Sequence, residues 1–209
     1  MTIKVRQRQM THSELIIATR NAGKAREFRE MLAPKGIIIK TLADFPNIGD
    51  IAETGTTFEE NATIKATAIA QQTSLPVLAD DSGLQVAALN GEPGIYSARY
   101  AGDHDDAANN QKLLTKLATV PADQRQAVFH STLVLVKPSG AKLVVDGEVS
   151  GEILTAPRGD NGFGYDPLFY IPEAHKTMAE MTDHEKNAIS HRGRAAEKMM
   201  QQFDSWWEA

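Results

Sequence analysis

Short apolar runs alternate along the chain with segments of helical periodicity. Leu15, Ile16 and Ile17 form a continuous apolar run, which predicts a buried strand over residues 14–18. Residues 22–33 then place apolar side chains at helical spacing, which predicts a helix that Pro34 ends. By the same criteria we expect further helices over 57–73, 106–118 and 190–207, and further strands over 37–39, 76–79, 84–88, 127–136 and 142–149.

Local signals refine these boundaries. Thr57 and Thr182 each precede a glutamate by three residues, which matches a capping box at a helix start. The turn-rich segment 138–140 favours an antiparallel hairpin between the strands that flank it. The glycine-rich segments 89–105 and 159–167 are expected to be irregular.

The order of elements predicts an α/β fold. Strand–helix units combined with a hairpin require a mixed sheet with both parallel and antiparallel neighbours. The 209 residues suffice for one large domain, which we place at residues 14–209. Residues 1–13 are basic and polar and are interpreted as a flexible N-terminal extension without a secretory signal.

Composition narrows the classes of function. The chain is 42% hydrophobic and 23% charged, as in ordinary soluble globular proteins. Its net charge of -5 argues against non-specific binding to duplex nucleic acid, which relies on many Lys and Arg contacts to phosphate. There are no cysteines, which excludes disulfides and thiol catalysis. No apolar stretch is long enough for a membrane span, so no membrane partner is expected.

Two adjacent carboxylates follow the apolar run 76–79. Asp80 and Asp81 there offer oxygen ligands for Mg²⁺, and one of them is a candidate to accept a proton from water. Glu53 and Glu60 are further candidate ligands, although Glu60 has a competing role in its capping box. The alternative is a turn at the strand end that an aspartate caps, and adjacent strand residues need not face one site.

The segment 19–24 follows another apolar run and precedes a helix. Free backbone N–H groups and the helix dipole favour an anion at such a helix start. Thr19 and Asn21 are candidate hydrogen-bond donors, Gly23 permits close approach, and Lys24 is a candidate to neutralise a phosphate. The spacing is not that of a Walker A loop, and a plain strand–helix turn remains the alternative.

Two further segments carry candidate chemistry for a nucleotide base. In the loop 159–167, Phe163 or Tyr165 could stack on a flat ring and Asp166 could accept hydrogen bonds from it, unless the segment is only a wide hairpin loop. Near the last helix, His191 and Arg192 follow Ser190 in a first turn where cations oppose the helix dipole. An anion or polar ligand opposite these two side chains would explain why basic residues occur at this helix start. The alternative is that they are solvated basic side chains without a ligand.

In this order the segments closely resemble the inosine triphosphate pyrophosphatase family of non-canonical purine nucleoside triphosphate pyrophosphatases. The resemblance covers roughly residues 14–204 and rests on several motifs together. These are ATRNAGK at 18–24, ETG at 53–55, TFEENA at 57–62, ADDSGL at 79–84, PGIYSARY at 93–100, GFGYDP at 162–167 and SHRG at 190–193.

The resemblance implies a two-lobed α/β fold around an elongated mixed sheet with a central substrate cleft. It implies Mg²⁺-dependent hydrolysis of ITP, dITP and XTP to the monophosphate and pyrophosphate, by a cytoplasmic homodimer. Asp81 and Lys24 are then expected to be catalytic, and Asp81 and Glu53 to bind the metal, with Asp80 and Glu60 as possible additions. The expected substrate-binding residues are Thr19, Arg20, Asn21, Ala22, Gly23, Lys24, Ser82, Phe163, Gly164, Tyr165, Asp166, Lys186, His191 and Arg192.

One position departs from the family pattern. Arg20 stands where many relatives of this kind carry glycine, and it is expected either to crowd the phosphates or to add positive charge. Two other classes of function stay open. A related Mg²⁺-dependent hydrolase of modified pyrimidine nucleotides would differ in the base pocket, and a non-catalytic nucleotide- or RNA-binding module would bind without releasing pyrophosphate.

Overall fold

The computed structural model describes residues 14–102 and 105–209, so the extension predicted for residues 1–13 lies outside the described residues. The described chain forms a seven-stranded sheet in the order β2-β1-β3-β4-β5-β6-β7. β1 pairs in parallel with β2 and β3, whereas every later pairing is antiparallel. The predicted mixed sheet is therefore confirmed.

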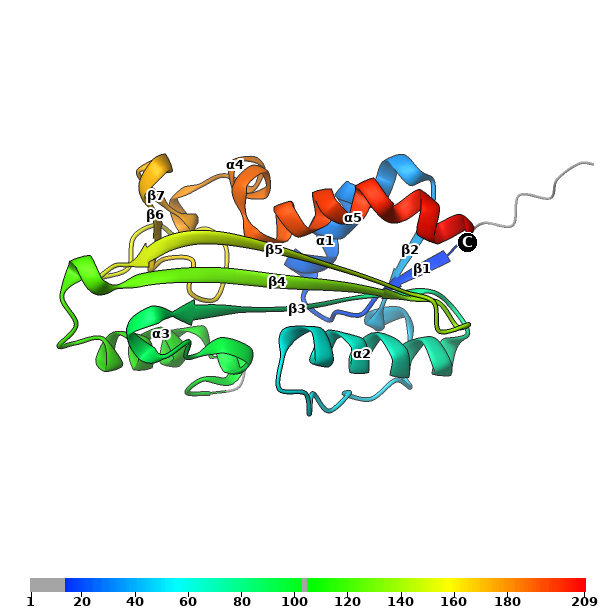
Figure 1. Ribbon diagram of the computed structural model, residues 1–209, viewed down its shortest axis with the longest axis horizontal. Coiled ribbons are helices and arrows are strands. Elements are labelled where there is room, and N and C mark those ends of the chain that lie inside the picture. The colour runs from blue at the N-terminus through cyan, green and yellow to red at the C-terminus, as the bar shows by residue number, and fades with distance from the viewer. Residues whose placement is uncertain (1–13, 103–104) are drawn as a thin grey trace, which may run out of the picture.

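The strands differ greatly in length, and the three longest run along the long axis of the molecule (Figure 1). Their bounds are β1 Glu14–Ile17, β2 Ile38–Thr41, β3 Val77–Val86, β4 Gln126–Val136, β5 Lys142–Ile153, β6 Phe169–Ile171 and β7 Lys176–Thr177.

Helices cover both faces of this sheet (Figure 1). They are α1 Ala22–Leu32, α2 Phe58–Thr73, α3 Asp106–Lys116, α4 Asp183–Ile189 and α5 His191–Glu208. In the view of Figure 1, α1, α4 and α5 lie above the sheet and α2 and α3 below it. Short 3-10 helices occur at Ala33–Lys35, Leu42–Asp44, Ala87–Leu89, Gly94–Arg99, Ala122–Gln124, Pro172–Ala174 and Met178–Glu180.

Strand β3 departs furthest from the prediction made from the sequence. We expected one strand to end at Ala79 and a second to begin at Leu84, whereas a single strand runs from Val77 to Val86. Every one of its residues pairs with β4, from Val77 with Val136 to Val86 with Ala127. The carboxylates therefore lie inside a strand, because the neighbouring β4 continues the backbone ladder past them.

Smaller corrections concern the loops and one helix cap. The segment 89–105 is not wholly irregular, because Gly94–Arg99 forms a 3-10 helix. The cap at Thr182 is a full capping box, as predicted. At α2 the cap by Thr57 is also confirmed, but the Glu60 carboxylate accepts the N–H of Thr56 instead. The hairpin of β4 and β5 is confirmed.

Three clusters of buried apolar side chains hold the sheet and helices together. One cluster unites α1, α5 and the start of β3 on one face, and a second packs α2 against the other face of the same strands. The third lies at the far end of the long strands and includes Leu84, Leu113 and Phe169. The molecule thus has two lobes, and β3 passes from one to the other.

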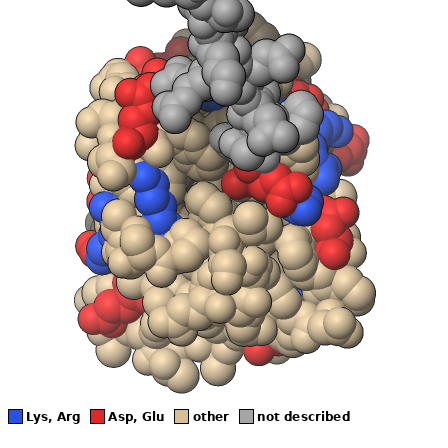
Figure 2. Space-filling model, turned by 90° about the vertical axis from the view of Figure 1, so that its right-hand side faces the viewer, with Lys and Arg blue, Asp and Glu red and all other residues tan. Residues whose placement is uncertain are grey.

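Figure 2 shows the molecule from the right-hand side of Figure 1. Acidic and basic side chains lie beside one another along the upper and lateral parts of this face, and its lower part carries few of either. No continuous basic patch forms among the described residues of this face, whereas duplex binding needs many cations together. Within residues 14–102 and 105–209, no helix is both long and apolar enough to span a membrane.

Candidate active site

Asp80, Asp81 and Ser82 form the polar middle of β3. Leu78 and Ala79, which precede them, belong to the clusters of the first lobe, and Leu84 belongs to the cluster of the second. β1 ends at this level, where the Ala18 N–H donates to the Leu78 carbonyl at 2.8 Å. The polar residues therefore lie between the lobes, where β1 leaves the edge of β3.

Asp80 faces α1 and α5. One of its oxygens, Oδ2, lies 2.7 Å from Lys24 Nζ and 3.3 Å from Arg192 Nη2. The other, Oδ1, accepts hydrogen bonds from the hydroxyls of Ser82 and of Ser131, the latter at 2.8 Å. Burial opposes the charge of Asp80, but Lys24 and Arg192 outweigh burial and hold its pKa well below the usual range.

Asp81 points to the opposite face, toward α2, as alternation along a strand requires. It is 8% exposed, and its Oδ2 has no hydrogen-bond partner among the described residues. Burial is the main cause that raises its pKa to about 6; Lys65 lowers the pKa, and the charges of Glu53 and Asp80 raise it. Asp81 is thus a buried carboxylate that is able to bind a cation or to exchange a proton near neutral pH.

Glu53 reaches this face from the loop before α2. Its carboxylate lies 2.5 Å from Lys65 Nζ and 3.3 Å from Arg99 Nη1. Burial would raise the pKa of Glu53, but these two cations lower it. Lys65 also lies 3.5 Å from the Asp80 carbonyl oxygen, so this lysine joins the loop to β3.

The turn 19–24 has structural contacts of its own. Asn21 caps α1 by accepting the Lys24 N–H at 3.1 Å, and Thr19 accepts the Asn21 N–H at 3.1 Å. Lys24 reaches across to Asp80, beside the predicted catalytic carboxylate. Arg20 turns away to the loop at 48–50, where it donates to the Ile48 carbonyl at 2.7 Å.

The predicted base-binding loop lies against α4 and α5. Asp166 accepts the Phe163 N–H at 2.9 Å and pairs with Lys186 at 2.6 Å in a buried ion pair. Burial raises the pKa of Asp166, and Lys186 opposes that shift. The cations of Lys186 and Arg192 lie 4.7 and 5.7 Å from the centre of the Phe163 ring.

Close packing in this loop depends on a glycine. Gly162 has φ of +81°, and a Cβ there would lie 2.0 Å from Asp166 Oδ2. Tyr165 belongs to the apolar core, and its hydroxyl donates to the Ser97 carbonyl at 2.8 Å. Phe163 is half-buried, which leaves it as the aromatic residue of this loop that a flat ring can reach.

His191 and Arg192 form the first turn of α5. The His191 ring stacks on Phe129 with centroids 4.8 Å apart, and its Nδ1 has no partner among the described residues. Burial, followed by the charge of Arg192, lowers the pKa of His191 well below its usual value, so the ring is neutral at physiological pH. Arg192 is buried and also pairs with Glu27 at 3.0 Å.

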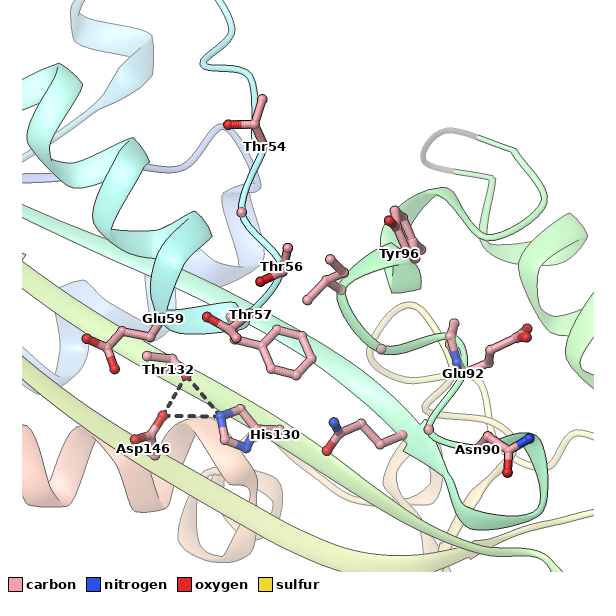
Figure 3. A pocket seen from close by; sticks show the side chains of 17 residues that line it. Thr54, Thr56, Thr57, Glu59, Asn90, Glu92, Tyr96, His130, Thr132 and Asp146 are labelled. Atoms are coloured by element: carbon pink, nitrogen blue, oxygen red, sulfur yellow. Dashed lines mark hydrogen bonds and ion pairs between the residues drawn. The ribbon is translucent and has the colours of Figure 1, made fainter.

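A hollow of about 780 Å³ opens on the α2 face beside this site. In Figure 3 the start of α2 with Thr54, Thr56 and Thr57 borders one side, and Glu92 and Tyr96 border the other. His130 lies at its floor, within 3.1 Å of Asp146 Oδ1. The hollow reaches the loop that carries Glu53, but none of Lys24, Asp81 or Arg192 lines it.

Several residues of the site carry no sequence signal. Lys65 sits on α2 within a helical pattern, Glu27 sits on α1, and Ser131 lies inside β4. Only the pairing of Ser82 with Ser131 across β3 and β4 brings that hydroxyl to Asp80. A correct β3–β4 register would have been the one signal able to identify it.

Comparison with known proteins identifies the family of the chain. A family model described as the Ham1 family matches residues 15–202, most of the chain. The chain belongs to the Ham1 family. The dITP/XTP pyrophosphatase of Lactiplantibacillus plantarum is 65% identical over 92% of this chain and 96% of its own length. The dITP/XTP pyrophosphatase of Geobacillus kaustophilus is 53% identical over 91% of this chain and 94% of its own length.

Solved structures agree with this membership. The HAM1 protein of Coxiella burnetii superposes with a TM-score of 0.85 at 45% identity and covers 92% of this chain and 99% of its own. The nucleoside-triphosphatase / dITP/XTP pyrophosphatase of Mycobacterium abscessus has a TM-score of 0.74 at 43% identity, with 89% and 97% covered. The mixed α/β architecture of the Ham1 family is therefore shared.

The residues around Asp81 suit a hard divalent cation. Carboxylate oxygens are the ligands Mg²⁺ takes, and Asp81 Oδ2 is buried without a hydrogen-bond partner among the described residues. Within residues 14–102 and 105–209 no group of three or more His, Asp or Glu side chains is arranged to hold a metal. Mg²⁺ is commonly bound by one or two carboxylates together with substrate phosphates, so Asp81 and Glu53 fit the ion in number and chemistry.

Proposed function

We propose that this chain hydrolyses non-canonical purine nucleoside triphosphates, namely ITP, dITP and XTP, to the monophosphate and pyrophosphate. The observation that carries the proposal is the buried Asp81, one oxygen of which has no partner within the described part of the chain, next to the Asp80–Lys24–Arg192 network. The Ham1 relatives named for dITP and XTP support the choice of substrates.

The proposed roles follow from the contacts. Lys24, together with the turn 19–24, binds the phosphates and offsets charge that develops on the leaving pyrophosphate. Asp81 orients the attacking water and takes its proton. Burial of Asp81 keeps competing water away from the carboxylate.

A magnesium ion belongs to this proposal. Asp81 and Glu53 would hold it, since both bring hard oxygen atoms to the α2 face of β3. When bound, Mg²⁺ supplies positive charge that neutralises phosphate oxygens and the leaving group. Asp80 and Glu60 are less suited, because Asp80 is saturated with donors and Glu60 is exposed and accepts from Thr56.

Selectivity for the base is assigned to the start of α5. Arg192 donates three hydrogen bonds, two to Asp80 and one to Glu27. A guanidinium group has five N–H donors, so donors remain for the 6-oxo oxygen of a purine. An amino group at that position, as in adenine, would meet a donor with a donor, and buried groups would stay unpaired. Phe163, which is half-buried beside Lys186 and Arg192, would stack on the purine ring.

The first experiment is a pyrophosphate-release assay with Mg²⁺ on ITP, dITP, XTP, GTP, ATP, UTP and dTTP. We expect the first three to react fastest. Rapid reaction of UTP or dTTP would favour a pyrimidine nucleotide hydrolase, and binding without release would favour a non-catalytic nucleotide-binding module.

Asp81→Asn tests the catalytic carboxylate directly. We expect kcat to fall by about 10²–10⁴, the usual contribution of a general base. Asp123→Asn is the matched control, since Asp123 is exposed in a distant 3-10 helix and its loss should leave kcat unchanged. Turnover by Asp81→Asn near the wild-type rate would remove Asp81 from the mechanism.

A homodimer in the cytoplasm is also part of the proposal, by analogy with the family. The exposed Tyr96 beside the hollow of Figure 3 is a candidate contact. Light scattering should give twice the mass of 22.8 kDa, and a mass of one chain would reject the dimer.

A further inference from the structure

We propose that Asp80 is a positioning residue that couples the phosphate end of the site to its base end by fixing Lys24 and Arg192 together. The inference rests on the proposed function, because these two cations matter jointly only if one nucleotide reaches both. It concerns a residue that the sequence offers as a possible metal ligand or proton acceptor, not as a positioning residue.

The contacts of Asp80 leave it little capacity for a metal. Its Oδ2 lies 2.7 Å from Lys24 Nζ, 3.3 Å from Arg192 Nη2 and 3.4 Å from Arg192 Nε. Its Oδ1 accepts from Ser82 and Ser131. A carboxylate has about four lone-pair sites, and five donors already approach them. A cation would have to displace lysine or arginine from a side chain that is almost wholly buried.

The two cations come from segments far apart in the chain. Lys24 lies on α1 and Arg192 on α5, helices that lie side by side above the sheet in Figure 1. Asp80 on β3 lies between them, and Glu27 holds the far side of Arg192 at 3.0 Å. Lys24 is therefore fixed by Asp80, whereas Arg192 is fixed by both Asp80 and Glu27.

Because of this difference, the effects of Asp80 on Lys24 and on Arg192 can be measured separately. Glu27→Gln disturbs only Arg192, whereas Asp80→Asn disturbs both cations while keeping the shape of the side chain. Inorganic tripolyphosphate probes the phosphate end without a base, and IMP probes the base end. Binding of each is measured by calorimetry, and kcat and KM for ITP are measured alongside.

Whether Asp80→Asn tightens or weakens tripolyphosphate binding decides if Asp80 positions Lys24. If Asp80 were only a negative charge near the phosphates, its removal would tighten anion binding. If it positions Lys24, Asp80→Asn weakens tripolyphosphate binding by about tenfold or more. Glu27→Gln should leave tripolyphosphate affinity within about twofold, and both variants should weaken IMP binding. Asp123→Asn should change neither.

A double variant protects the test from a folding failure. Asp80→Asn leaves the half-buried Lys24 and the buried Arg192 with a weaker partner, which can destabilise the fold. In a Lys24→Gln background one of these cations is gone, and a residue that acts through Lys24 should then change tripolyphosphate affinity by less than about twofold. Thermal unfolding of each variant verifies that the protein is folded.

The outcomes are distinct. The inference is overturned if Asp80→Asn binds tripolyphosphate as tightly as wild type or more tightly. It is also overturned if Asp80→Asn weakens tripolyphosphate binding as much in the Lys24→Gln background as it does in wild type. Recovery of Asp80→Asn activity by excess Mg²⁺ also overturns it, because that would indicate a metal ligand. Wild-type protein that releases no pyrophosphate from ITP, dITP or XTP would instead reject the proposed function.

Discussion

Replacing Asp81 by asparagine should stabilise the protein while it removes activity. The carboxylate is buried and has an oxygen with no hydrogen-bond partner among the described residues. The folded state therefore pays a cost to keep this group ionised. Asparagine has nearly the same shape and carries no charge, so it avoids that cost.

The size of the effect follows from the pKa. Burial raises the pKa of Asp81 from 3.8 to about 6. The two values differ by about two, and each pKa unit corresponds to about 1.4 kcal/mol, so ionising Asp81 costs the folded state about 3 kcal/mol. Because the folded state holds the proton more tightly, the free energy of unfolding should fall as pH rises from about 4 to about 6.

The assay is urea unfolding of wild type and Asp81→Asn in the presence of a chelator. We expect the variant to be more stable by up to about 3 kcal/mol above pH 7 and to match wild type near pH 4. Asp123→Asn should have the same free energy of unfolding as wild type at both pH values. A variant no more stable than wild type at pH 7.5, or stabilised equally at both pH values, would refute the link between burial and charge.

Other perturbations test the packing around the site. Lys186→Met leaves Asp166 as a buried unpaired carboxylate, so it should cost about 3–5 kcal/mol and lower Tm by about 10 °C in a thermal melt. Gly147→Ala places a Cβ 2.1 Å from the His191 carbonyl oxygen, so it should cost at least about 1–3 kcal/mol in urea unfolding. Arg20→Gly should keep KM for ITP within about twofold and speed hydrogen exchange at residues 48–50, because Arg20 contacts that loop.

Matched controls make these results interpretable. Lys176→Met removes an exposed pair with Glu185 and should cost less than about 1 kcal/mol. Gly49→Ala places a Cβ in open space and should be close to neutral. The structural reasoning is contradicted if Lys186→Met is as stable as Lys176→Met, or if Gly147→Ala is as stable as Gly49→Ala. A change of KM for ITP well beyond twofold in Arg20→Gly would also contradict it.

Most long elements were predictable because each has a strong local pattern. α2 has its Thr57 cap and helical spacing, and the β4–β5 hairpin has its turn residues. β3 was misread because two adjacent aspartates look like a strand end when only propensity is considered. The pairing partner β4 overrides that preference, and no local pattern reveals it. β6 and β7 have three and two residues, too few for a period to be visible.

The site was predictable in part for the same reason. Residues in short polar motifs, such as Asp80, Lys24 and Arg192, stand out in the sequence, and the structure brings these three into direct contact. Lys65 and Ser131 do not stand out, because one lies within an amphipathic helix and the other within a strand. Their roles depend on the tertiary arrangement alone. Tyr165 shows the opposite error, since an aromatic in a glycine-rich motif is a core residue.

The alternation of Asp80 and Asp81 has a consequence for how a ligand must be shaped. Lys24 and Arg192 lie on one side of the sheet and Glu53 and Lys65 on the other. The backbone of β3 separates these groups, and β1 ends beside it at Ile17. A single ligand that contacts both sides must therefore be extended and flexible. Compact ions such as orthophosphate should therefore occupy a single side and leave the other unfilled.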